Sequence, residues 1–187
     1  MEFTLKYEGL LRANGSVKDK QALRRAFHSQ LRELTLQPPF SNRPDSGLVY
    51  DDNEREEPCC LFELSGFNFR PLISVRMKAI AELDIIMLRP EPPGAIVTQA
   101  GDIDNRLKTL LDSLRIPQSE NAIPKGDSPA DSEAPFFCLL EDDNLITKLM
   151  ISTDRLLQPG CDSSFVSLLI RVKTKVLFVT CRNIDLA

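Results

Sequence analysis

The stretch GDIDNRLKTLLDSLR, residues 101–115, decides the fold, because it predicts the helix around which the other elements are arranged. Apolar residues recur in it at helical spacing and make one face: Ile103, Leu107, Leu110, Leu111 and Leu114. Asp104 stands early in this run, where a carboxylate oxygen can accept hydrogen bonds from the free backbone N–H groups of a first turn. We therefore expect an amphipathic helix with Asp104 as its N-cap.

A row of charges lies beside that apolar face, because Asp104, Lys108 and Asp112 are four residues apart. Such a row usually forms a salt-bridge ladder on an exposed helix surface. A second acidic cluster, the sequence EDD at residues 141–143, comes just before another apolar run and gives the row a different interpretation. In that interpretation the two acidic segments meet in the folded chain and hold one cation.

The composition limits the kinds of protein that this chain can be. Its 187 residues are enough for one domain with a sizeable core, since 42% of them are hydrophobic. The formal charge of −4 excludes a wholly basic nucleic-acid-binding coat, although a local basic face stays open. A single histidine, His28, excludes metal sites built from several histidines and disfavours a Ser-His-Asp triad. We expect His28 to be a surface or packing residue.

The cysteines and the apolar runs indicate a cytoplasmic protein without a membrane segment. Five cysteines at scattered positions, without CxxC spacing, fit neither a zinc site nor a disulfide framework. Reduced thiols of this kind suit the cytosol. The first residues, MEFTLKYEGLL, lack the features of a signal peptide, and no apolar run approaches the ~20 residues of a membrane span.

The N-terminal part of the chain predicts a strand, a turn and a basic helix. Alternating apolar residues indicate a half-buried strand at residues 3–7, and Ala13-Asn14-Gly15 indicates a turn. Ser16 with Asp19 resembles a capping box, which begins a helix that ends near Thr35. The outer face of this helix is cationic: Lys18, Lys20, Arg24, Arg25 and Arg32. We interpret it as a solvated face, with a phosphate-contacting surface as the alternative.

Two strands and two connections are expected between this helix and the central one. Residues 37–58 are rich in proline and acid, which is typical of a solvated loop. Residues 59–64 and 80–88 predict strands, the second of them buried, and residues 66–71 predict a break between them. Asp84, inside the buried strand, either faces solvent or points towards the acidic cluster.

Beyond the central helix, residues 116–135 lack periodicity and predict a long exposed loop or an insertion. Residues 136–140 predict a return to the core. The apolar runs at residues 145–151 and 164–172 predict an antiparallel pair of strands, and residues 175–181 predict a last short strand.

These elements together predict an α+β fold. We expect one mixed α/β domain over residues 1–187, with a small sheet packed on a central helix. No internal repeat interrupts this arrangement.

Four carboxylates stand near the ends of these elements: Asp102, Asp104, Asp142 and Asp143. Carboxylates held close together repel one another unless a cation offsets their charge. Mg²⁺, or Mn²⁺ in its place, takes oxygen ligands from a few carboxylates and from substrate phosphate. Lys108, one turn from Asp104, would bind the scissile phosphate or orient the nucleophile. The alternative is that all four acids are surface charges beside a strand and a helix.

The acidic segments also resemble a known signature. The pattern D-x-D-N-x-x-K-x-x-x-D, followed by D-D and an apolar strand, is similar to that of the RusA-type Holliday junction resolvases. Five fixed positions match in the first half: Asp102, Asp104, Asn105, Lys108 and Asp112. The second half is the Asp142-Asp143 pair with the run Asn144-Leu145-Ile146 after it. The resemblance covers roughly residues 79–174.

The resemblance implies a homodimeric endodeoxyribonuclease that cuts Holliday junctions or other branched DNA by Mg²⁺-dependent phosphodiester hydrolysis. It implies that Asp102, Asp104 and Asp143 hold the metal and act in catalysis, with Asp142 as a further ligand. It also implies that Lys108 acts at the phosphate. Asn105 would brace the acidic loop, and Asp112 would orient Lys108.

Several features depart from the family pattern. Residues 1–70 form an N-terminal extension without an assignable match, and residues 116–135 form a loop insertion between the two acidic segments. A junction-binding protein needs cationic surface, for which we expect Arg24 and Arg25 on the basic helix and Lys173 and Lys175 near the C-terminus.

These departures keep two other functions open. One is a catalytically inactive RusA-like DNA-binding or protein-interaction module. The other is a nucleotidyl transferase that uses the Asp102/Asp104 pair. The second is disfavoured because the Gly-Ser loop that such enzymes place before their acidic pair is missing.

Overall fold

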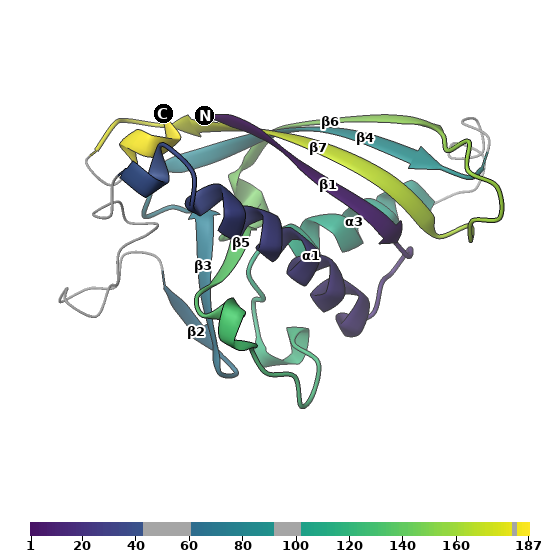
Figure 1. Ribbon diagram of the computed structural model, residues 1–187, viewed down its shortest axis with the longest axis horizontal. Helices are drawn as coiled ribbons and strands as arrows, with labels where there is room; N and C mark the ends of the chain where they lie inside the picture. Colours follow the sequence, from purple (N-terminus) through teal and green to yellow (C-terminus); the bar gives the residue numbers. More distant parts are fainter. Residues whose placement is uncertain (43–60, 92–101, 181–182) are drawn as a thin grey trace.

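The structure is a computed structural model that describes residues 1–42, 61–91, 102–180 and 183–187 (Figure 1). For Asn42, Asp102 and Asp185 it describes the backbone and not the surroundings of the side chain. Three predictions lie partly outside the described residues. They are most of the acidic loop expected at residues 37–58, the start of the strand expected at residues 59–64 and the end of the strand expected at residues 175–181.

A four-stranded sheet forms the upper layer of the molecule in Figure 1. Its order is β1 (Glu2–Leu10), β7 (Phe165–Val176), β4 (Ala79–Arg89) and β6 (Ile146–Arg155). β4 pairs antiparallel with β7 and parallel with β6. The expected antiparallel pairing of the last two apolar runs is therefore wrong. β4 lies between them because its inward side chains are all buried, which suits a central strand.

Two helices, α1 (Val17–Thr35) and α3 (Asp102–Leu114), cover one face of this sheet. α1 begins with the expected capping box, in which Ser16 and Asp19 bond reciprocally. α3 begins at Asp102, so the prediction of Asp104 as its N-cap is wrong: Asp104 lies inside the first turn. Asp104 has helical neighbours on both sides, and an N-cap stands outside the helix.

A second, three-stranded sheet points away from the first, towards the bottom of the view in Figure 1. It consists of β2 (Phe62–Leu64), β3 (Phe67–Ile73) and β5 (Phe136–Leu140), in the order β2-β3-β5. The predicted break at residues 66–71 is confirmed only at Gly66, and the rest of it is wrong because β3 begins at Phe67. Ser65 and Gly66, both with positive φ, make a tight hairpin, and β3 then continues through Pro71.

The main core lies between the four-stranded sheet and the two helices. The buried inward residues of β4 meet Leu110 and Leu114 of α3 and Leu23 and Phe27 of α1. Because these are the apolar positions at helical spacing, the central amphipathic helix is confirmed. A smaller cluster holds the second sheet, with Phe67, Phe69, Ile116, Ile123, Phe136 and Cys138.

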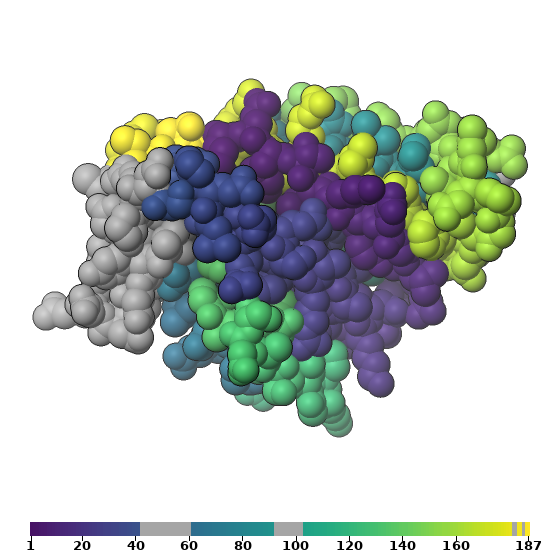
Figure 2. All heavy atoms as spheres, in the orientation of Figure 1, coloured from purple at the N-terminus to yellow at the C-terminus, as the bar shows by residue number. Residues whose placement is uncertain are grey.

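Residues 116–135 are not simply an exposed loop. Ile116, Ile123 and Glu133 are buried, and the segment packs against α1, as the green and dark blue spheres of Figure 2 show. Arg25 of α1 donates to Glu133 at 2.8 Å and to Asp127 at 2.9 Å. This segment therefore fastens the second sheet to the first helix.

The two ends of the chain lie side by side (Figure 1). The Met1 ammonium donates to Leu186 O at 3.0 Å, and Thr174 N of β7 donates to Met1 O at 2.9 Å. Because β1 is a sheet strand and α1 covers the core, residues 1–42 belong to the body of a single α+β domain. Neither α-helix in the described residues is long and apolar enough to cross a membrane.

Candidate functional site

The C-terminal end of α3 is joined to the segment that carries the second acidic cluster. Ile116 N donates to Leu140 O at 2.9 Å, so the chain leaving α3 runs beside the end of β5. The acidic residues follow β5 directly, and α3 contacts the short helix η5 (Asp143–Leu145). The fold thus places the C-terminal end of α3 beside the second acidic cluster.

The N-terminal half of α3 presents its charged residues to solvent. Asp104 and Lys108 are both exposed, and neither forms an ion pair within the described ranges. Asn105 is half-buried, and its backbone carbonyl accepts a hydrogen bond from Thr109 Oγ1 at 3.0 Å. The side chain of Asp102 lies outside the described residues.

Asp112, near the other end of α3, is held by two cations. Its carboxylate accepts from Lys20 Nζ at 2.7 Å and from Arg115 Nη2 at 2.9 Å. Burial opposes its ionisation, but the hydrogen bonds from Lys20 and Arg115 outweigh burial and lower the pKa of the carboxyl. Asp112 therefore contacts Lys20 and Arg115 rather than Lys108, and it fastens α3 to α1.

Arg115 also lies against the second acidic cluster. Its guanidinium is 3.9 Å from Asp142 and 3.8 Å from Asp143, measured between the nearest nitrogen and oxygen atoms. These distances exceed a hydrogen bond, whereas the bond to Asp112 is a normal one. Asp142 caps η5 by accepting from Asn144 N at 3.0 Å. The acidic pair is thus balanced electrostatically by Arg115 without being bound tightly to it.

The predicted metal ligands do not form a closed set in the described part of the chain. Among those residues, no group of three His, Cys, Asp or Glu side chains is placed to hold a metal ion. Asp142 and Asp143 lie near Arg115, and Asp104 lies more than two turns earlier on α3. A site that also uses Asp102 stays a prediction.

The cations expected to contact DNA have partners in the protein. Arg24 is 2% exposed, so its expected place on the outer face of α1 is wrong. Arg24 stands three residues before Phe27, at the edge of the apolar face of α1, and this spacing could have predicted its burial. Its charge favoured the opposite interpretation. Arg25 bonds Glu133 and Asp127, Lys173 bonds Glu2 at 2.9 Å, and Lys175 bonds Glu82.

Two further predictions concern single residues. His28 packs in the interior: its Nδ1 accepts from Phe137 N at 2.8 Å, and its Nε2 lies 3.2 Å from Ser132 O. Because Nδ1 accepts a hydrogen bond, it carries no proton, and burial lowers the pKa of His28 in the same sense. The ring is a packing residue, which confirms that interpretation. Asp84 lies between two buried residues of β4, so it faces away from the core.

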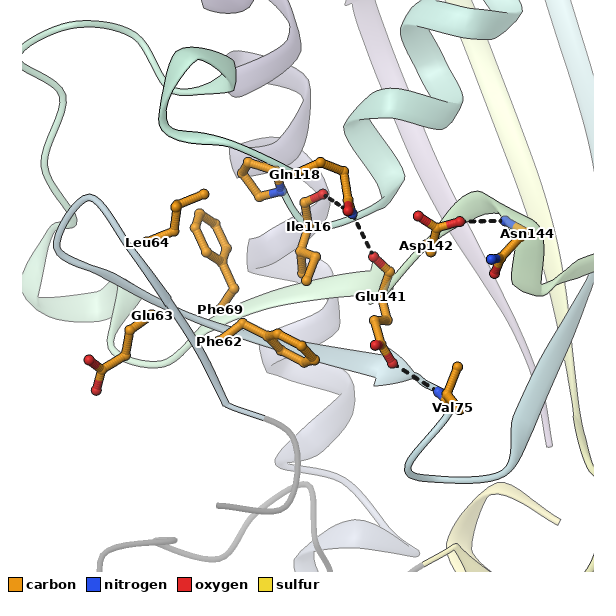
Figure 3. Close-up of a pocket in the computed structure, with 11 residues that line it drawn as sticks. Phe62, Glu63, Leu64, Phe69, Val75, Ile116, Gln118, Glu141, Asp142 and Asn144 are labelled. Carbon is orange, nitrogen blue, oxygen red and sulfur yellow. Dashed lines mark hydrogen bonds between the residues drawn. The ribbon is translucent and has the colours of Figure 1, made fainter. Parts of the chain in front are cut away.

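Sequence reasoning missed a groove beside the acidic cluster (Figure 3). It has a volume of about 420 Å³, with Phe62, Phe69 and Ile116 on its apolar side. Asp142 and Asn144 stand at one end of it, and Gln118 lines it and donates to Ile116 O and to Glu141 O. Its lining comes from four separate segments, so no local pattern predicts it.

No protein family, curated protein or solved structure matches the chain.

Proposed function

We propose that the protein is a metal-dependent, structure-selective DNA endonuclease of the RusA type, which acts in the cytoplasm on Holliday junctions or other branched DNA. One observation carries the proposal: α3 presents Asp104 and Lys108 one turn apart, exposed and without an ion pair in the described residues. A carboxylate can hold Mg²⁺, or Mn²⁺ in its place, and an ammonium group can bind the phosphate. When bound, the metal would activate water and offset charge on the phosphoryl group.

Asp102, Asp104, Asp142 and Asp143 offer the oxygen ligands that such an ion takes, although the described side chains do not bring three of them together. Arg115 does not occupy the oxygens of Asp142 and Asp143 with hydrogen bonds, because it bonds Asp112 at 2.9 Å and lies 3.9 and 3.8 Å from the acidic pair. Lys108 would bind the scissile phosphate or orient the nucleophile. Asn105 would brace the first acidic segment.

The test is cleavage of labelled four-way, flap and linear DNA with Mg²⁺ present or chelated. We expect Asp104→Asn to lower the cleavage rate by at least about a thousandfold, a loss on the order of 4 kcal/mol. Asp131→Asn, which neutralises an exposed acid of residues 116–135, is the matched control and should leave the rate unchanged. If Asp104→Asn cuts branched DNA as fast as the parent protein, the proposal is wrong.

A catalytically inactive RusA-like module is the second candidate. Two observations favour it: Arg115 lies beside Asp142 and Asp143, and the cations expected to bind DNA have protein partners. A ligand that binds only the folded protein raises its stability, so thermal melts with and without Mg²⁺ or Mn²⁺ separate the candidates. The endonuclease predicts a rise in Tm that Asp104→Asn removes, and the module predicts no rise at millimolar metal.

The exposed face of the four-stranded sheet supports the homodimer that we propose with this activity. Glu82, Asp84 and Ile86 of β4 stand opposite Lys173, Arg171 and Leu169 of β7. A two-fold axis along the strands would therefore set acids against cations and Ile86 against Leu169 in the second copy. Ile86 and Leu169 are 43% and 41% exposed, as unpartnered interface residues would be.

Sedimentation velocity tests this interface. We expect a dimer for the parent protein and a monomer for Ile86→Lys. Ile184→Lys, at a similarly exposed residue outside this face, is the control and should stay dimeric. A monomeric parent contradicts the homodimer, and a dimeric Ile86→Lys places the interface elsewhere.

A further inference from the structure

A second cavity, of about 360 Å³, opens between the first half of α1 and the chain that leaves α3. Three cations line it, Lys20, Arg24 and Arg115, against one carboxylate, Asp112. The lining residues thus carry three positive charges and one negative charge, and Asp142 and Asp143, outside the cavity, lie 3.9 and 3.8 Å from Arg115. None of the carboxylates proposed as metal ligands lines this cavity.

Arg24 is a buried cation that is bonded to no carboxylate. Its guanidinium donates to Arg115 O at 3.2 Å, to Asp112 O at 2.9 Å and to Gln21 Oε1. All three acceptors are neutral oxygens, and burial lowers the pKa of Arg24. A buried charge is costly unless an opposite charge offsets it, and Asp112 is already shared between Lys20 and Arg115. An anion in the cavity would supply the missing charge.

Arg115 adds a donor without an acceptor. Its Nε is buried and makes no hydrogen bond, and the Asp143 oxygen nearest to it is 3.8 Å away. A buried donor left without a partner costs about 1–3 kcal/mol, so a ligand that accepts from it is favoured. Lys20 contributes as well, because its ammonium group has three donors and Asp112 uses one of them.

We propose that this cavity binds a phosphate group. Phosphate offers several strong acceptor oxygens and the negative charge that Arg24 lacks among its partners, and arginine and lysine are the side chains that bind it best. The volume is about twelve times the ~30 Å³ that one water occupies in the liquid, so the site has room for a phosphate and part of the molecule that carries it. The carrier is a nucleic-acid strand or a small phosphorylated molecule.

The first experiment measures thermal melts with inorganic phosphate and with pyrophosphate, against chloride at equal ionic strength. The parent protein should be stabilised by the phosphates beyond chloride. Lys20→Gln should weaken that binding at least tenfold, and Lys20→Arg should restore most of it. Lys18→Gln removes one exposed charge from the same helix outside the cavity and should bind as the parent does. Equal stabilisation by chloride, or equal binding by Lys20→Gln and Lys18→Gln, overturns the proposal.

A second experiment identifies the carrier, using a short single-stranded oligonucleotide over a range of salt concentrations. If the carrier is nucleic acid, Lys20→Gln should weaken binding and reduce the salt dependence by about one phosphate contact. If the carrier is a small molecule, Lys20→Gln should impair phosphate binding and leave oligonucleotide binding unchanged. Phosphate binding by Asp104→Asn should equal that of the parent, which separates failure of this site from failure of the nuclease proposal.

Discussion

Both ends of helix α3 carry charged side chains, but those at the C-terminal end are bonded to other charged groups and those in the N-terminal half are exposed. At its C-terminal end, Asp112 is bonded to Lys20 and Arg115, and the backbone carbonyls of Asp112 and Arg115 accept from Arg24. In its N-terminal half, Asp104 and Lys108 are exposed and have no ion pair within the described residues. Charges that are bonded hold elements together, whereas exposed unpaired charges are available to a ligand. Asp112 therefore maintains the fold, whereas Asp104 and Lys108 are free to contact a ligand under the proposed function.

The largest effect on stability is expected at Arg24. Arg24→Met leaves two backbone carbonyls at the end of α3 without their donor, and each buried unpaired group costs about 1–3 kcal/mol. We expect the free energy of unfolding to fall by about 3 kcal/mol, measured by chemical denaturation. Lys18→Met is the control on the exposed side of α1. A loss below about 1 kcal/mol would show that this end of α3 is not fastened through Arg24.

Thr109, in the middle of α3, is bonded to the loop before α1. Gly15 N donates to Thr109 Oγ1 at 2.9 Å, and a Cβ added to Gly15 would lie 2.6 Å from Thr109 Cγ2. Gly15→Ala should therefore cost about 1–3 kcal/mol, as overpacking does. Thr109→Ser removes the clashing methyl group and keeps the hydroxyl, so the double variant should regain most of the loss. If the double variant is no more stable than Gly15→Ala, the close contact is not the cause.

A smaller effect, dependent on pH, is expected at Asp112. Because its folded pKa is lowered from 3.8, its contribution to stability is present above that value and is lost as the pH falls through the folded pKa. Asp112→Asn should cost about 1–2 kcal/mol at pH 7, since two charged hydrogen bonds are weakened. It should also flatten the acid side of the stability profile. Denaturation from pH 7 to pH 2.5 measures both, and an unchanged acid side would contradict the assignment.

The smallest effect on stability is expected in the exposed half. Asp104→Asn and Lys108→Gln should each change the free energy of unfolding by no more than about 0.5 kcal/mol, because their side chains make no ion pair in the described residues. Denaturation of both variants without added metal is the measurement. A loss near that of Asp112→Asn would remove the distinction between the two ends of the helix.

Much of the fold was predictable because its signals are local. The capping box of Ser16 and Asp19 began α1, and the spacing of Leu107, Leu110 and Leu114 gave α3 and its buried face. The strand order was not predictable in this way. The pairing of β4 with both β6 and β7 depends on which strand can bury its inner face completely, and that is decided across the whole sheet.

The candidate site also has features that follow from local sequence and features that depend on tertiary packing. The sequence by itself determined that Asp104, Lys108 and Asp112 share one side of a helix, because helical spacing follows from backbone geometry within a few residues. Only the tertiary structure decided that Asp112 meets Lys20, 92 residues earlier in the chain, and that Arg24 is buried. The reason is physical: a charged side chain takes the partners that packing brings near it, and these come from segments whose separation in sequence carries no record of their separation in space.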